Sequence, residues 1–207
     1  MKVIEASAEL AQNLDATEIM RHIERAGRVC YKSESNISDT SAEKFIANII
    51  KSGHESVIEH VSITFKIICD RGVSHEIVRH RLASYSQESS RYCDYSGEKF
   101  GGELTFIKPC FWNDGDENYL LWKKTMSQIE ETYLAMRKND AKPEEARSIL
   151  PNSLKTELFM TANLREWRHF LKLRTSKRAH PQMRQIALQI YEILSSKLPI
   201  IFSDIVI

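Results

Sequence analysis

The sequence has little of what secreted, membrane-spanning or disulfide-stabilised proteins require. Its four cysteines lie far apart and form no C-x-x-C pair, which argues against a disulfide framework. No apolar run approaches the roughly 18 residues of a membrane span, and the segment from Met1 to Leu10 does not resemble a signal peptide. We therefore expect a reduced protein in the cytoplasm, with no membrane partner.

Several common motifs for metals and nucleotides are also missing. There is neither a G-x-G-x-x-G fingerprint nor a G-x-x-x-x-G-K-[ST] loop, so phosphate binding would have to use other residues. His54-Glu55 and Glu59-His60 do not form H-E-x-x-H. Asp114-Gly115-Asp116 lacks the rest of a calcium loop. We predict no metal site.

The formal net charge is only +1, so no overall field attracts nucleic acid or a membrane surface. The charge is uneven, because residues 165–184 hold seven Lys or Arg against one acid, Glu166, while the remainder holds 22 basic and 27 acidic residues. A compact positive patch suits a small anionic ligand better than a long polyanion. We expect no stable nucleic-acid partner.

Length and periodicity indicate the fold class. A chain of 207 residues, 42% of them hydrophobic and without repeats or flexible linkers, is long enough for one domain, residues 1–207. Alternation of apolar residues predicts strands at 61–70, 104–107 and 154–160. Apolar spacing and capping residues predict helices that begin near Asp15, Thr40, Ser74, Tyr119, Pro143, Asn163 and Pro181. The sum is an α+β domain with a mixed or antiparallel sheet flanked by helices, one of them long.

The richest stretch for chemistry is Arg79-His80-Arg81, followed after seven residues by Ser89 and then by Ser90-Arg91. Guanidinium forks match the paired oxygens of phosphate, and hydroxyl groups add donors. Residues 67–98 contain four arginines and no lysine, although the chain has fifteen lysines. This composition favours recognition of phosphates by fixed, bidentate contacts; the alternative from spacing alone is a set of surface arginines at a helix end. An extended chain at 89–91 would place Ser89 and Arg91 on the same side.

These residues resemble the signature of the flavin-dependent thymidylate synthases, Arg-His-Arg, seven residues, then Ser. Further segments match that family in order between about residues 50 and 190: Gly53-His54-Glu55-Ser56, Glu59-His60, Ser74-His75-Glu76, Arg147-x-x-Leu150-Pro151, Asn163-x-Arg165, His169-Phe170 and Leu173-Arg174. One departure is Ser86-Gln87, where relatives often have Asn-Glu.

The resemblance implies a reductive methylation. Members of that family convert dUMP to dTMP with a one-carbon unit from methylenetetrahydrofolate, and FAD reduced by NADPH delivers the hydride. The family fold is an α+β subunit, and four subunits form a homotetramer with active sites at subunit junctions.

The resemblance also implies roles for individual residues. Arg174 is expected to stabilise negative charge on the uracil ring, because a guanidinium cannot act as a base. His54 is expected to assist on the folate and flavin side. The expected FAD ligands are Ser56, Arg79, His80, Arg81, Gln87, Asn163, Arg165 and His169. The expected nucleotide ligands are Glu76, Arg79, Ser89, Ser90, Arg91, Arg147 and Arg174.

Three other interpretations stay open at this stage. Ser89 at a signature position invites a nucleophile role, but no base lies beside it in the sequence, so we interpret it as a ligand. Pro109-Cys110 is similar to the catalytic dipeptide of the folate-dependent thymidylate synthases that use a cysteine nucleophile. A non-catalytic nucleic-acid-binding module that uses residues 165–184 is the third.

Overall fold

The computed structural model describes residues 1–207 and is built on a four-stranded antiparallel sheet. Its order is β2 (Ser7–Leu10), β3 (Ser62–Asp70), β6 (Lys155–Asn163) and β4 (Ala83–Gln87). The two long central strands pair over their whole length. The sequence predicted both central strands, but β2 and β4 were missed because each is too short to show a clear alternation.

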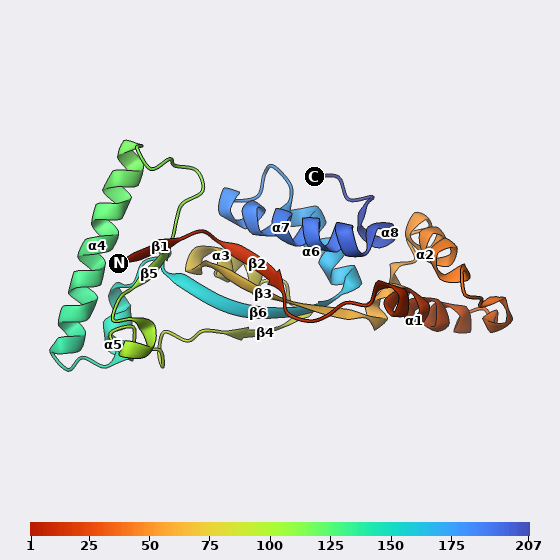
Figure 1. Ribbon diagram of the computed structural model, residues 1–207, viewed down its shortest axis with the longest axis horizontal. Coiled ribbons are helices and arrows are strands. Elements are labelled where there is room, and N and C mark those ends of the chain that lie inside the picture. The colour runs from red at the N-terminus through yellow and green to blue at the C-terminus, as the bar shows by residue number, and fades with distance from the viewer.

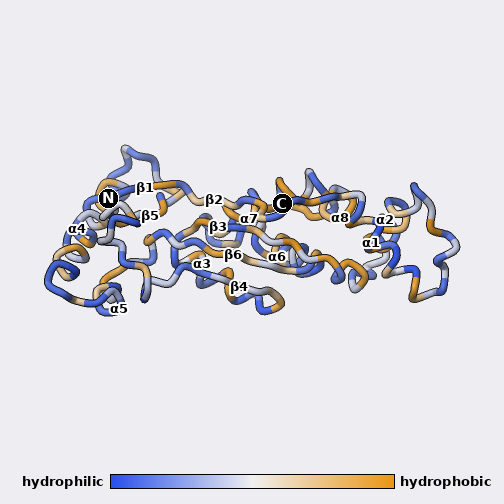
Figure 2. The backbone as a smooth tube through the Cα atoms, turned by 60° about the horizontal axis from the view of Figure 1, so that its bottom comes forward, coloured by the Kyte–Doolittle hydropathy of each residue, from blue (hydrophilic) through white to orange (hydrophobic).

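One face of this sheet holds the main core. In β3 the alternate residues Ile63, Phe65 and Ile67 are fully buried, as the period of two requires. They pack against α6 (Leu164–Arg174) and α7 (Pro181–Lys197), which cover that face of the sheet (Figure 1). Apolar stretches of the tube therefore gather where these strands and helices meet (Figure 2).

The molecule is elongated, with helices at both ends of the sheet (Figure 1). At one end lie α1 (Ala16–Val29) and α2 (Ser41–Lys51), and at the other lies the long helix α4 (Glu117–Lys138). A small parallel pair, β1 (Lys2–Ile4) with β5 (Thr105–Ile107), lies near α4. The predicted α+β class with an antiparallel sheet is confirmed, and the parallel pairing is confined to this short ribbon.

Short elements complete the chain. They are the 3-10 helices η1 (Glu34–Asn36), η2 (Glu55–His60), η3 (Glu98–Phe100) and η4 (Arg147–Ile149), and the helices α3 (Arg71–Ile77), α5 (Pro143–Ala146) and α8 (Pro199–Phe202). None of the helices has the length and apolar character needed to cross a membrane.

The helix caps test the sequence analysis directly. Asp15 caps α1 and Asn163 caps α6, each by accepting the backbone N–H three residues on, as predicted. The predicted cap at Ser74 is wrong. Asp70 caps α3 instead, by accepting from the backbone of Val73 at 2.6 Å, and Ser74 is buried inside the helix. The strand β3 therefore passes into α3 without an intervening turn.

Candidate functional site

A groove runs along α6 where this helix faces the loop after α3. It consists of two adjoining hollows of about 530 Å³ and 480 Å³, which share Leu82, Glu166 and His169. The first hollow is also lined by Glu55, Glu59, Asn163, Arg165 and Lys172, and the second by Arg79, His80, Arg81, Leu173 and Arg174. We call this continuous depression the α6 groove.

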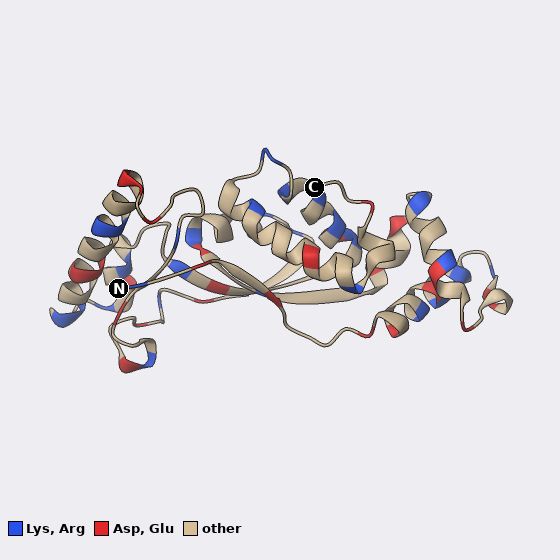
Figure 3. Cartoon of the chain, turned by 45° about the horizontal axis from the view of Figure 1, so that its top comes forward, with Lys and Arg blue, Asp and Glu red and all other residues tan.

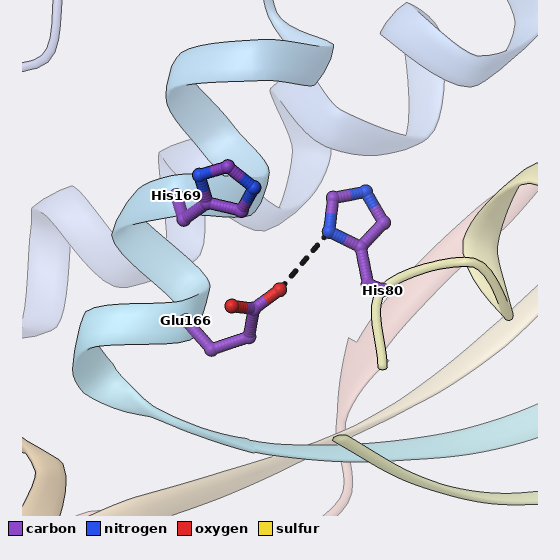
Figure 4. Close-up of side chains that lie close together, drawn as sticks. All are labelled: His80, Glu166 and His169. Atoms are coloured by element: carbon purple, nitrogen blue, oxygen red, sulfur yellow. Dashed lines mark hydrogen bonds and ion pairs between the residues drawn. The ribbon is translucent and has the colours of Figure 1, made fainter. Parts of the chain in front are cut away.

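Local structure explains why α6 presents these side chains. The helix begins where β6 ends, since the Asn163 side chain accepts the backbone N–H of Glu166 at 2.9 Å. Residues three and four apart share one helix face, so Glu166 and His169 project together. Figure 4 shows both pointing from α6 toward His80, which lies on the loop after α3.

Neighbouring residues fix both the imidazole and the backbone of His80. Its Nδ1 lies 3.0 Å from Oε1 of Glu166, and only 5% of His80 and 6% of Glu166 is exposed (Figure 4). The imidazole packs 4.9 Å from the ring of Phe170. The hydroxyl of Tyr85 donates to the backbone carbonyl of His80 at 2.7 Å and so fixes the loop to β4.

Arg174 occupies the last position of α6 and reaches back to the same loop. Its Nε donates to Nε2 of His80 at 3.1 Å, and its Nη1 donates to the carboxylate of Glu76 at 2.8 Å. A guanidinium has no acceptor, so Nε2 of His80 must carry a lone pair and the ring proton must lie on Nδ1, facing Glu166. Burial lowers the pKa of His80 below 6.5, and the charge of Arg174 lowers it further, against the opposing effect of Glu166.

The donor set in the groove does not suit a metal ion. His80, Glu166 and His169 offer ligand atoms within 4.8 Å of one another. A metal on Nδ1 of His80 would displace the ring proton while Nε2 still accepts from Arg174, which would require an imidazolate. The positive side chains of Arg79, Arg81 and Arg165 line the same groove and favour an anion instead.

A second group of predicted ligands lies at the other end of β4. Ser90 is buried, and Arg91 donates to Glu144 of α5 at 2.9 Å, close to Arg147 in the next helical turn. We call Ser89, Ser90, Arg91 and Arg147 the Arg91 cluster. The five residues of β4 span about 17 Å. None of the four residues of the Arg91 cluster lines the α6 groove.

The segment at Ser89 differs from the extended conformation considered above. The extended strand ends at Gln87, and the backbone N–H groups of Tyr92 and Cys93 both donate to the carbonyl of Ser89. This turn accounts for the difference, because Ser89 and Arg91 no longer follow the alternation of a strand. The Ser89 hydroxyl accepts from the backbone of Arg91 at 3.3 Å.

Three predicted cofactor or catalytic residues do not line the groove. The amide nitrogen of Gln87 donates to Ser74 and Thr156, which leaves its amide oxygen for a ligand. His54 and Ser56 are exposed on either side of Glu55, which does line the groove. The structure thus brings their segment to the groove without bringing these two side chains into its lining.

Sequence reasoning missed the role of Glu166 as the partner of His80, and missed Leu82, Glu55 and Glu59 as groove residues. The i, i+3 spacing of Glu166 and His169 was a usable signal, since it places both on one helix face. No sequence signal pairs Glu166 with a residue 86 positions earlier.

The basic segment 165–184 is less positive in three dimensions than its sequence suggested. Four of its seven basic residues pair with acids from elsewhere in the chain: Arg165 with Glu59, Arg168 with Glu55 and Asp204, Lys172 with Glu55, and Arg174 with Glu76. Acidic and basic residues are also mixed along α4 and around α1 and α2 (Figure 3). A surface of this kind offers little for a long polyanion.

Comparison with known proteins identifies the family of the chain. The family described as "Thymidylate synthase complementing protein" (Thy1) matches residues 13–200. The flavin-dependent thymidylate synthase of Pyrococcus furiosus is 38% identical over 167 residues, which are 80% of this chain and 68% of that protein. The Geobacter sulfurreducens enzyme of the same name is 33% identical over 186 residues, 86% of this chain and 78% of its own.

A solved structure supports the fold. The UMP/dUMP methylase PolB from Streptomyces cacaoi, crystallised with 5-Br dUMP, superposes with a TM-score of 0.79 at 23% identity. The superposition covers 98% of this chain and 96% of that chain. The match over residues 13–200 and the relatives above 30% identity place the chain in the Thy1 family, the family of the flavin-dependent thymidylate synthases.

Proposed function

We propose that this protein reductively methylates dUMP to dTMP in the cytoplasm. Methylenetetrahydrofolate supplies the one-carbon unit, and FAD reduced by NADPH supplies the hydride. The observation that carries the proposal is the convergence of Arg79-His80-Arg81 with Arg174 at one groove, from segments that are far apart in the sequence.

The α6 groove fits a flavin dinucleotide. Arg79, Arg81 and Arg165 offer guanidinium donors to a pyrophosphate, and the N-terminus of α6 at Asn163 favours negative charge. Leu82 is 74% exposed in this polar groove and offers an apolar contact for a ring system. Arg165 now donates to Glu59 at 2.5 Å, so binding would exchange one anionic partner for another.

FAD supplies the hydride chemistry when it is bound, and the chain supplies orientation and charge. Arg174 holds a fixed positive charge at the groove, where it would stabilise negative charge that develops on the uracil ring. Arg79 and Glu76 lie beside it as nucleotide ligands. His54, on the segment that borders the groove through Glu55, would assist on the folate side.

The nucleotide phosphate would be bound by the Arg91 cluster of a second copy of the chain. In one chain the Arg91 cluster lies at the other end of β4 and outside the lining of the α6 groove, so the groove of that chain lacks these phosphate ligands. A symmetric assembly solves this problem, because each groove can face the Arg91 cluster of a neighbour. We propose a homotetramer with its active sites at the subunit junctions.

The visible spectrum of the purified protein tests this function. In the absence of oxygen, we expect flavin bands that bleach with NADPH and return only when dUMP and methylenetetrahydrofolate are added together. Formation of dTMP is measured on the same samples, and omission of either substrate is the control. A colourless protein that binds no added FAD and forms no dTMP would rule the proposal out.

A further inference from the structure

We propose that Glu166 is a positioning residue that fixes the tautomer of His80 and thereby holds the guanidinium of Arg174 in place. The kinetic consequence rests on the proposed function of Arg174. The structural part of the proposal, the tautomer, can be measured without any turnover.

The geometry is a continuous series of hydrogen bonds. Asn163 accepts from the backbone of Glu166, the Glu166 carboxylate accepts from Nδ1 of His80, and Nε2 of His80 accepts from Arg174. Arg174 then donates to Glu76 at 2.8 Å. The series begins at Asn163, which caps the start of α6, and ends at Arg174, the last residue of α6. It passes through His80, which lies on the loop after α3.

The carboxylate and the guanidinium both favour the same state of the ring. An ionised carboxylate can only accept, so it requires a proton on Nδ1 of His80. Without Glu166 the buried Nδ1–H has no acceptor, and only the bond from Arg174 opposes a move of the proton to Nε2, where it would face the Nε–H of Arg174 and place two donors against each other. The guanidinium would then lose one of its two side-chain partners.

The surroundings of His80 leave Glu166 as the anionic acceptor on the Nδ1 side. The groups that face the imidazole are Glu166, His169 and Arg174 of α6. Tyr85 of β4 bonds only the backbone carbonyl, and Glu76 of α3 is occupied by Arg174. Because His80 and Glu166 are both buried, water does not readily replace the missing acceptor.

The decisive experiment reads the tautomer in the holoenzyme. Protein labelled with ¹⁵N-histidine is studied by two-bond ¹H–¹⁵N correlation spectroscopy, and the His80→Gln variant assigns the signal by its loss. We expect the Nδ1–H tautomer in the parent and a shift toward Nε2–H in Glu166→Ala. Glu166→Met, which has a similar length and no acceptor oxygen, replaces the alanine variant if that one fails to fold.

Kinetics on the same variants test the consequence for Arg174. We expect kcat to fall by about 10- to 100-fold in Glu166→Ala, since a wrong tautomer misplaces the catalytic group. The KM for dUMP should change by less than about threefold, because the contacts that bind dUMP equally in the ground state and the transition state are retained. Glu166→Gln, whose amide oxygen can still accept from Nδ1, should recover part of kcat, and Glu192→Gln on the exposed face of α7 is the matched control.

The two proposals can fail separately. An unchanged Nδ1–H tautomer in Glu166→Ala, or an unchanged kcat with the tautomer shifted, would overturn the role of Glu166. A parent enzyme that binds no flavin and forms no dTMP would instead overturn the proposed function, and the tautomer measurement would still decide whether Glu166 controls His80.

Discussion

The buried guanidinium of Arg168 lies 3.0 Å from the carboxylate of Glu55, which connects α6 to the start of η2. Only 1% of Arg168 is exposed. The same guanidinium donates to Asp204 after α8 at 2.6 and 2.7 Å and to the carbonyl of Ile201. This single side chain therefore fixes the wall of the α6 groove that Glu55 forms and the C-terminal segment behind it.

Replacement of Arg168 by Met should destabilise the protein and loosen the groove. We expect the free energy of unfolding to fall by about 3 kcal/mol, because Glu55 and Asp204 lose their shared partner. Urea denaturation measures the loss, and the flavin content of the purified variant reports the state of the groove. Arg25→Met, which breaks an exposed pair with Glu18, should cost less than about 1 kcal/mol. Equal losses in the two variants would contradict the role of Arg168.

Arg174→Ala and Arg91→Ala should affect different steps. Arg174→Ala should abolish turnover while FAD stays bound, because the lost charge is needed at the uracil ring. Arg91→Ala should mainly raise the KM for dUMP, by about tenfold or more, because a charge-assisted contact to phosphate is lost. Steady-state kinetics with a flavin spectrum of each variant separate these effects. Parent-like kcat in Arg174→Ala would remove its catalytic role.

Mixed assemblies test whether one site uses two chains. When Arg174→Ala and Arg91→Ala subunits are unfolded together and refolded at equal amounts, about a quarter of the sites should combine an intact Arg174 with an intact Arg91. At dUMP concentrations well below the KM of the Arg91→Ala variant, activity should therefore rise above that of either variant alone. Each variant refolded by itself is the control. A mixture no more active than its components would show that Arg174 and Arg91 act within one chain.

Stability should depend on pH through Asp94. The Arg137 guanidinium donates to Asp94 at 3.0 and 2.7 Å and, with Ser96, holds the pKa of that carboxyl well below its ordinary value of 3.8. A lowered folded-state pKa gives stability that is fully present above 3.8 and is lost as the pH falls through the folded-state value. Asp94→Asn should lower the free energy of unfolding at neutral pH by about 1 to 3 kcal/mol.

The free energy of unfolding of Asp94→Asn should also depend less on pH in the acidic range than that of the parent. Urea unfolding of parent and Asp94→Asn at about pH 7 and about pH 3 measures this, since only the parent loses part of the Asp94 contribution as the pH falls below 3.8. If the parent instead gained stability relative to Asp94→Asn on acidification, the result would contradict the ion pair between Asp94 and Arg137.

Cys110→Ser should leave turnover within about twofold of the parent, as for other surface substitutions away from a site. Cys110 follows β5 outside the α6 groove, and desolvation raises the pKa of its thiol, which disfavours the nucleophilic thiolate. Thiol alkylation of the parent should likewise spare dTMP formation. Loss of activity in both experiments would favour the cysteine-nucleophile mechanism.

The local features of the fold were predictable from the sequence. The alternation in 61–70 predicted β3, and the capping residues Asp15 and Asn163 marked the first residues of α1 and α6. The prediction failed at Ser74, where a neighbouring cap residue, Asp70, was available four positions earlier. Both outcomes depend on hydrogen bonds between residues only a few positions apart, and the sequence shows which residue types stand at those positions.

The composition of the candidate site was also visible, since the residues that resemble the family signature include most of those that line the α6 groove. The division of these residues into two groups was not visible. It depends on β4 being extended between Arg81 and Ser89, and the five residues of β4 are too few to show a periodic pattern.

By itself, the sequence determined the main helices and the two central strands, which of their faces are apolar and which side chains can bind an anion, because these follow from neighbours a few residues apart. The tertiary structure alone decided that Glu166 meets His80, that Arg174 reaches both His80 and Glu76, and that the Arg91 cluster lies away from the groove. Those relationships depend on the register of the sheet and on how α6 packs against the loop after α3, and no local pattern specifies either.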